Sequence, residues 1–187
     1  MRWIAVLISI LSVSTTAFAS LELGVNYAYK KSSFDANNNQ ESQSTTGSIS
    51  FYFWERVALE GSYTNSLFVK KEKQPEFAGA FQRTTTQNTD VYGLDLIFVL
   101  SDRKAMFQPY LKGGAAHVKV KQMVQDDNNN PWEINYSGVS PSYGVGFKLF
   151  LTQAFAFRCS YDAIETPTTD NTKVTELNGR VGVSWIF

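Results

Sequence analysis

Apolar and polar residues alternate along most of this chain, in eight segments separated by polar stretches. Side chains of a β-strand point alternately to its two faces, so each segment predicts a strand with one apolar and one polar face. The predicted strands are residues 21–30, 43–54, 57–69, 84–100, 108–124, 139–151, 154–163 and 175–187. In the last strand the apolar residues other than Ile186 share one parity: Leu177, Val181, Val183, Trp185 and Phe187.

Two positions disturb this pattern. In residues 108–124 the apolar parity changes between Leu111 and Val118, and a β-bulge near Gly113-Gly114 would account for the change. Pro141 falls inside another predicted strand, where it removes a hydrogen-bond donor from the ladder. We expect it to mark the outer end of that strand.

The connections between predicted strands alternate in length. Short links fall at residues 54–56, 101–106 and 152–153, and long polar ones at residues 32–42, 70–83, 125–135 and 164–172. Short periplasmic turns with longer extracellular loops are typical of outer-membrane barrels. We therefore predict an all-β fold, an eight-stranded antiparallel up-and-down transmembrane β-barrel. Both termini lie on the periplasmic side in this arrangement, and aromatic residues form a girdle at each membrane interface.

A soluble lipocalin-like barrel is the alternative with the same strand number. Its apolar face points inward, and its polar face meets water, so that face should be rich in Lys and Glu. Here the polar parity is mostly Gly, Ser, Thr, Ala and Asn. Small residues suit the narrow interior of an eight-stranded barrel, so the pattern favours the membrane barrel.

The first residues of the chain indicate export. Arg2 precedes an apolar run, and Ala17-Phe18-Ala19 fits a cleavage site, so residues 1–19 are predicted to be a signal peptide and residues 20–187 the barrel domain. Without Arg2 the chain has 16 basic and 17 acidic residues, which implies no nucleic-acid partner. The single Cys159 cannot form an internal disulfide.

Gly-rich segments add a family resemblance. Residues 109–114 read Pro-Tyr-Leu-Lys-Gly-Gly, residues 143–147 read Tyr-Gly-Val-Gly-Phe, and the chain ends in Phe. With eight alternating segments and the export signal, the chain resembles the small OmpA, OmpX and opacity-protein barrels. The resemblance implies a monomer in the outer membrane of a Gram-negative bacterium, in contact with lipid and lipopolysaccharide. It also implies that the barrel-assembly machinery reads the terminal segment, in particular Val181, Val183, Trp185 and Phe187.

Charged residues on the polar parity are the sharpest internal feature. Inside a narrow barrel they must be paired or hydrated. We predict a salt-bridged network that fills the lumen and either stabilises the barrel or gates a small pore. Its expected members are Glu22, Glu60, Asp95, Lys112, Lys148, Arg158, Asp162, Glu176 and Arg180.

Candidate chemistry is sparse elsewhere. His117 is the only histidine, so a lipid A-modifying enzyme would depend on it, but the sequence His117-Val118-Lys119 lacks the nearby serine of the barrel deacylases. We expect no catalytic, metal or cofactor site. A structural or surface-binding role carried by the extracellular loops is the leading hypothesis, with a small gated pore as the alternative. The loop aromatics Phe77, Phe81 and Trp132 are the candidate contacts for an extracellular ligand.

Overall fold

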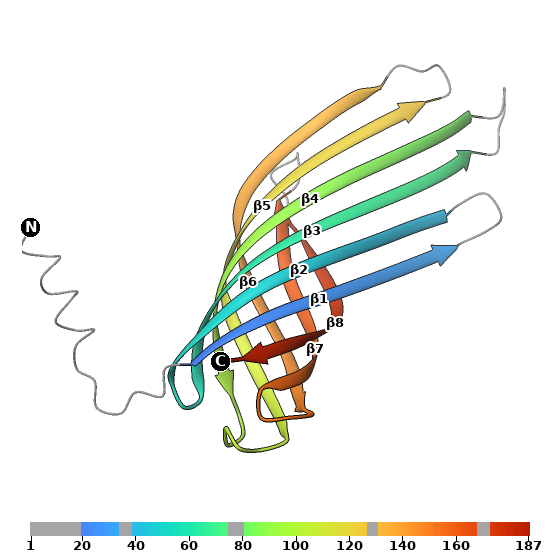
Figure 1. The fold of residues 1–187 in the computed structure, drawn as a ribbon. Helices are drawn as coiled ribbons and strands as arrows, with labels where there is room; N and C mark the ends of the chain where they lie inside the picture. The colour runs from blue at the N-terminus through green and yellow to red at the C-terminus, as the bar shows by residue number, and fades with distance from the viewer. Residues whose placement is uncertain (1–19, 34–38, 75–80, 127–130, 168–172) are drawn as a thin grey trace, which may run out of the picture.

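The protein is a closed barrel of eight antiparallel strands, each paired with its neighbours in chain order (Figure 1). The computed structural model describes residues 20–33, 39–74, 81–126, 131–167 and 173–187. Among these residues no helix has the length and apolar character needed to cross a membrane. The predicted fold class is confirmed. The strands are β1 (Ser20–Ser33), β2 (Asn39–Trp54), β3 (Val57–Gln74), β4 (Phe81–Val99), β5 (Phe107–Asp126), β6 (Trp132–Phe150), β7 (Phe155–Pro167) and β8 (Lys173–Ile186).

Alternating side chains separate an outward apolar belt from a polar interior. On β2, Ile49 and Phe51 are about half exposed, whereas the alternating residues Ser48 and Ser50 are buried. The same alternation recurs on the other strands. An apolar surface of this extent is unfavourable in water, but hydrocarbon solvates it, and a closed ladder leaves no unpaired backbone toward lipid. The belt therefore faces the bilayer.

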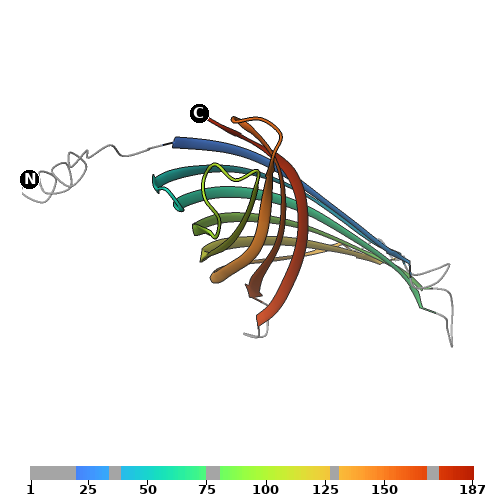
Figure 2. The same cartoon turned by 90° about the horizontal axis from the view of Figure 1, so that it is seen from below.

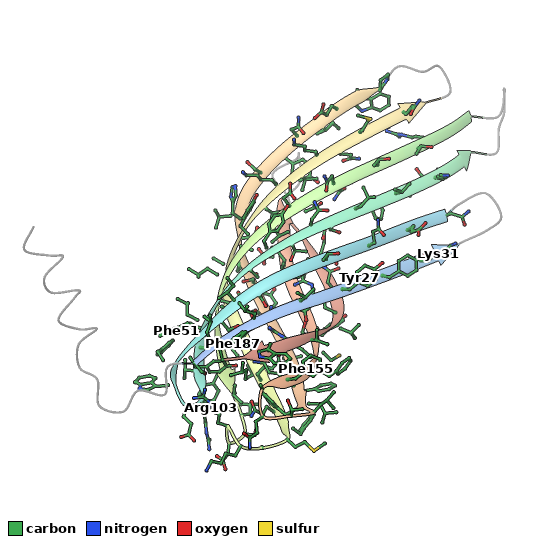
Figure 3. All side chains as sticks on the ribbon, in the orientation of Figure 1. Tyr27, Lys31, Phe51, Arg103, Phe155 and Phe187 are labelled. Carbon is green, nitrogen blue, oxygen red and sulfur yellow. The ribbon has the colours of Figure 1, made fainter. Side chains whose placement is uncertain are left out.

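Both ends of the described chain meet at the edge that carries the short turns, which we call the turn end. The backbone N–H of Phe187 donates to the carbonyl of Leu21 at 2.8 Å. Phe51, Phe155 and Phe187 lie near this end, and Tyr27 lies toward the opposite, loop end (Figure 3). Ring pairs mark both levels. The centroids of Phe155 and Trp185 are 5.8 Å apart at the turn end, and those of Tyr63 and Tyr92 are 5.1 Å apart farther out.

The strands extend farther toward the loop end than the sequence pattern predicted. β6 begins at Trp132 rather than Val139, and β3 reaches Gln74 rather than Val69. A membrane-spanning strand needs about 9–11 residues, so strands of 16–20 residues from β2 to β6 project well beyond the hydrocarbon. The outer face of the projecting part meets water, so the outward apolar alternation of the belt does not mark it in the sequence, and backbone pairing reveals it.

The predicted bulge near Gly113-Gly114 is wrong. β5 pairs without interruption with β4 and with β6 across this position. The parity change is real instead: Val118, Val120 and Val124 point inward and are about 1% exposed. Beyond the lipid the outer face of β5 meets water. Polar residues therefore occupy its outward positions there, and valines occupy its inward positions.

The barrel is fully closed only toward the turn end. β1 pairs with β8 from Glu22 to Tyr27, and β6 pairs with β7 only as far as Ser142. Farther out, the sheet β1–β6 parts from the hairpin β7–β8, as both views show (Figures 1 and 2). Pro141 is the first β6 residue beyond the β7 pairing. The expectation that Pro141 marks the outer end of its strand is wrong, because β6 continues to Trp132 in its pairing with β5. Pro141 lies instead where β6 becomes an edge toward β7, a position that tolerates a residue without an N–H.

Candidate functional site

The lumen toward the turn end is filled by charged side chains in equal numbers. Four acids and four bases point inward, and no one of these side chains is more than 7% exposed. Each has an oppositely charged group within 4 Å, so the group as a whole is close to neutral. We call it the lumen network: Glu22, Glu60, Asp95, Lys112, Lys148, Arg158, Asp162 and Arg180.

Lys148 forms the layer nearest the turn end. Its ammonium donates to Glu22 Oε2 at 2.5 Å and to the Tyr52 hydroxyl at 2.6 Å. The Tyr52 hydroxyl in turn donates to the same Glu22 oxygen at 2.8 Å. The ammonium also lies 5.2 Å from the ring centroid of Tyr52. Because these groups come from β1, β2 and β6, this layer ties distant strands together across the lumen.

Arg158 of β7 forms the next layer. Its guanidinium makes two contacts with the Glu60 carboxylate of β3, Nη1 to Oε2 at 2.7 Å and Nη2 to Oε1 at 3.1 Å. Its Nε–H donates to the Tyr110 hydroxyl at 2.9 Å, and the Ser50 hydroxyl donates to Glu60 at 3.0 Å. Two-pronged pairing of this kind holds both groups in one orientation. The Arg158–Glu60 pair therefore bridges opposite walls of the barrel.

Lys112 of β5 is shared among three carboxylates. Its Nζ lies 2.9 Å from Asp162, 3.7 Å from Glu60 and 3.8 Å from Asp95. Arg180 of β8 lies 3.4 Å from the other oxygen of Asp162. Lys112 thus connects the Arg158 layer to the next layer toward the loop end, which contains Asp162 and Arg180. It has more than one carboxylate partner within 4 Å.

Several buried polar atoms near the network have no hydrogen-bond partner in the described part of the chain. They include Glu22 Oε1, Asn26 Oδ1, Ser184 Oγ and Arg180 Nε. Buried polar groups are rarely left unpaired, and ordered water commonly satisfies them.

The turn after β4 folds beneath the lumen at the turn end. Gln108, which is 4% exposed, donates from Nε2 to the carbonyl of Arg103 at 2.6 Å and to that of Ala105 at 3.2 Å. The Arg103 guanidinium lies 5.7 Å from the Tyr52 ring centroid. A cavity of about 820 Å³, lined in part by Tyr52, Gln108 and Ile186, opens between this turn and the network. The network therefore separates this vestibule from the rest of the lumen.

Not every predicted site residue joins this network. Glu176 is half-buried on β8, four positions beyond Arg180 toward the loop end, where it acts electrostatically on Tyr136. Phe77 and the Phe81 side chain lie outside the described residues. The prediction that Trp132 lies in a loop is wrong, because this residue begins β6. The Arg83 guanidinium lies 5.3 Å from its ring centroid. The terminal residues point outward, between 42% and 68% exposed: Val181, Val183, Trp185 and Phe187.

Sequence reasoning missed the neutral partners of the network. Tyr52 and Tyr110 are buried inside the barrel, although both aromatics lie next to belt residues in the sequence. Ser142 donates to the Asp95 carboxylate. Strand parity contained the signal, because all three residues share the inward parity of their strands.

His117 and the nearby serines lie on opposite faces of the sheet. His117 pairs with Val139 and has outward parity, whereas Ser140 and Ser142 point inward and are 2% and 6% exposed. A serine nucleophile must hydrogen-bond its histidine base. The geometry of β5 and β6 therefore does not build the serine–histidine pair that a lipid-modifying enzyme would need at His117.

The sequence matches the family described as the outer membrane protein beta-barrel domain over residues 4–187. The chain belongs to this family. A comparison with curated proteins finds no match. Solved structures of the same architecture include the N-terminal barrel domain of OprF from Pseudomonas aeruginosa, at 18% identity and a TM-score of 0.57, covering 90% of this chain and 97% of that one.

Two further outer-membrane proteins share the fold. OprG from Pseudomonas aeruginosa is 10% identical with a TM-score of 0.56, covering 91% of this chain and 97% of that chain. Neisserial surface protein A is 12% identical with a TM-score of 0.50, covering 89% and 95%. At such identities the likeness concerns the fold. The family match identifies this chain as an outer-membrane β-barrel, so the apolar belt contacts the lipid of that membrane.

Proposed function

We propose that this barrel does not conduct, and that it serves the outer membrane as a structural element whose loop end is a binding surface. The observation that carries the proposal is the lumen network. It places equal numbers of buried acids and bases across the lumen, with Lys148 and Arg158 almost fully buried. An ion crossing the membrane would have to break these pairs, which are expensive to separate in a poorly solvated interior.

The projecting sheet supports the binding half of the proposal. The β3–β4 ladder runs from Val57–Phe98 to Gln74–Phe81, eighteen residues on β3, whereas the hydrocarbon needs about ten. The excess raises polar strand ends above the lipid. On β4 the outward residues change from Leu94 and Tyr92 to Asp90 and Asn88 along this direction. A paired sheet presents its side chains in fixed positions, which lowers the entropic cost of binding a partner.

Single-channel recording tests the first half. The refolded mature chain in a planar bilayer should give no discrete current steps, and Arg158→Ala should give them if the network is the seal. Reproducible steps from the unmodified barrel would overturn the proposal.

A shortened barrel tests the second half. Ser66 and Thr89 are register partners, so residues 67–88 can be replaced by an Asn-Gly turn without changing the pairing below. Cells expressing the shortened barrel should lose attachment to other cells and surfaces but keep the membrane integrity that the full barrel provides. Unchanged attachment would contradict a binding role for this hairpin. Shortening the β5–β6 hairpin between Val120 and Tyr136, also register partners, gives a matched control on another hairpin.

A small gated pore is the second candidate, and Lys112 is the observation that favours it. Because three carboxylates lie within 4 Å of its ammonium, Lys112 can change partners without losing its counter-charge. The vestibule at the turn end would give ions access to the network from the periplasm. In that case the recordings above should show brief, rare openings that Lys112→Gln alters.

The remaining proposals concern export, assembly and lipid contact. We infer that the chain is exported by the signal peptide of residues 1–19, which lie outside the described residues, and inserts as a monomer. We further infer that the barrel-assembly machinery recognises the outward residues of β8 that end in Phe187, and that lipopolysaccharide contacts the outer half of the belt. No nucleic-acid partner or cofactor is proposed.

A further inference from the structure

The outward face of β5 changes from apolar to basic along its length, and the exposed Met123 follows the basic residues. Phe107 and Leu111 belong to the apolar belt, whereas His117, Lys119 and Lys121 occupy the same parity farther out. His117 lies ten positions after Phe107, and a tilted strand needs about 9–11 residues to cross the hydrocarbon. The basic residues therefore stand at the height where the acyl chains of the outer leaflet end and its headgroups begin.

Of the residues paired in register with the two lysines, one is acidic. On the β6 side, Ser137 pairs with Lys119 and Asn135 pairs with Lys121, and both neighbours are uncharged. On the β4 side, Asp90 pairs with Lys119. The Asp90 carboxylate, however, is hydrogen-bonded on its other flank to β3.

Two donors of β3 hold Asp90. The Tyr63 hydroxyl donates to Asp90 Oδ1 at 2.7 Å, and Asn65 Nδ2 donates to the same oxygen at 2.9 Å. Among the described residues, no ion pair within 4 Å joins Asp90 to Lys119 or Lys121. Asp90 acts electrostatically on both Lys119 and Lys121, so the outward basic residues of β5, which we call the β5 stripe, set two lysines against this one register-paired carboxylate.

The aromatic girdle holds one of these lysines in place. Lys119 Nζ lies 5.4 Å from the ring centroid of Tyr92, whose ring packs against Tyr63. A cation over an aromatic face is attracted to it but retains its N–H donors. Lys119 is therefore positioned along the barrel wall, and its ammonium can still bind an anion.

We propose that His117, Lys119 and Lys121 form a binding site for the phosphate of an outer-leaflet lipid headgroup. The occupant is a lipid because the stripe continues directly into exposed apolar wall. Beside and below it Val139, Leu94 and Leu111 are 70%, 57% and 46% exposed. A phosphate at the lysines would let the acyl chains of the same molecule lie against these side chains. This site rests on the proposed contact between outer-leaflet lipid and the belt, and it does not depend on whether the lumen conducts.

Native mass spectrometry of the refolded mature chain in neutral detergent micelles tests the site. Short-chain phosphatidic acid, which carries a phosphate monoester, is titrated beside phosphatidylcholine with the same acyl chains. The unmodified barrel should bind phosphatidic acid more tightly. Lys119→Gln with Lys121→Gln should weaken that binding by about fivefold per lysine, hence about 25-fold, and leave phosphatidylcholine unaffected. The charge-preserving pair Lys119→Arg with Lys121→Arg should keep most of the affinity.

The matched control removes two other outward lysines. Lys31 of β1 and Lys71 of β3 are exposed on the same parity but on other strands (Figure 3 labels Lys31). Lys31→Gln with Lys71→Gln lowers the net charge equally and should leave binding of phosphatidic acid unchanged. Equal losses in both double variants would reduce the effect to net charge and overturn the site. Displacement of the lipid by an equal concentration of inorganic phosphate would show a free-anion site and would also overturn the proposal. Gel mobility with and without boiling checks that every variant is folded.

Discussion

Replacing Arg158 with methionine removes one side of the best-defined ion pair in the lumen. Two N–H contacts to Glu60 and one to Tyr110 are lost. Among the described residues, Glu60 would retain contacts with the Ser50 hydroxyl at 3.0 Å and the Lys112 ammonium at 3.7 Å. Breaking a buried pair by removing one partner costs about 3–5 kcal/mol, because the remaining charge is left uncompensated. With Lys112 already close to Glu60, we expect the free energy of unfolding to fall by about 3 kcal/mol.

Replacing Glu60 as well should restore part of the lost free energy of unfolding. In Arg158→Met with Glu60→Gln, no uncompensated carboxylate remains, so the double variant should be more stable than the sum of the single changes predicts. We expect a coupling energy of about 2 kcal/mol, which lies in the range for residues in one network.

Urea unfolding of the barrel in lipid vesicles measures these free energies. Tryptophan fluorescence reports the transition, because Trp54 and Trp185 are exposed in the girdle at the turn end. Arg56→Met is the matched control. Its partner Asp102 and Arg56 itself are largely exposed, so breaking that pair should cost less than about 1 kcal/mol. If Arg158→Met destabilises no more than Arg56→Met, the lumen network does not stabilise the barrel and the reasoning fails.

Three other changes test different parts of the structure. Gly182→Ala should destabilise the barrel, because an added Cβ would meet the Val25 carbonyl and the Asn26 backbone. Gly47→Ala should be tolerated, because no heavy atom lies within 4 Å of its added Cβ. Urea unfolding compares the two variants. Deleting Phe187 should slow insertion by purified assembly machinery more than it lowers the unfolding free energy of barrel already folded, and equal insertion rates would make that residue an ordinary girdle aromatic. Arg180→Ala frees Asp162 from one partner and should lower stability or raise conductance, so a variant unchanged in both would refute a role for this pair.

Much of this fold is readable from strand parity. Inside the hydrocarbon a strand has lipid on one face and a narrow polar lumen on the other. Apolar and polar residues therefore alternate in the sequence of such a strand. Parity also placed eight of the nine expected charges in one buried network, because side chains that share the inward parity of a closed barrel have no other place to go. The terminal residues of β8 were assigned to the outer face by the same reasoning.

Parity could not supply the partners or the shape beyond the membrane. Arg158 and Glu60 come from β7 and β3, and only barrel closure brings them within 2.7 Å. The valines of β5 looked like a register error from the sequence, because their environment changes only where the strand leaves the lipid. For the same reason, the outward face of the strand ends that project beyond the lipid shows no apolar alternation from which the sequence could predict them. Periodicity records the solvent on each face of a strand, whereas distances across the lumen and the point where β6 leaves β7 depend on how the whole sheet curves and closes.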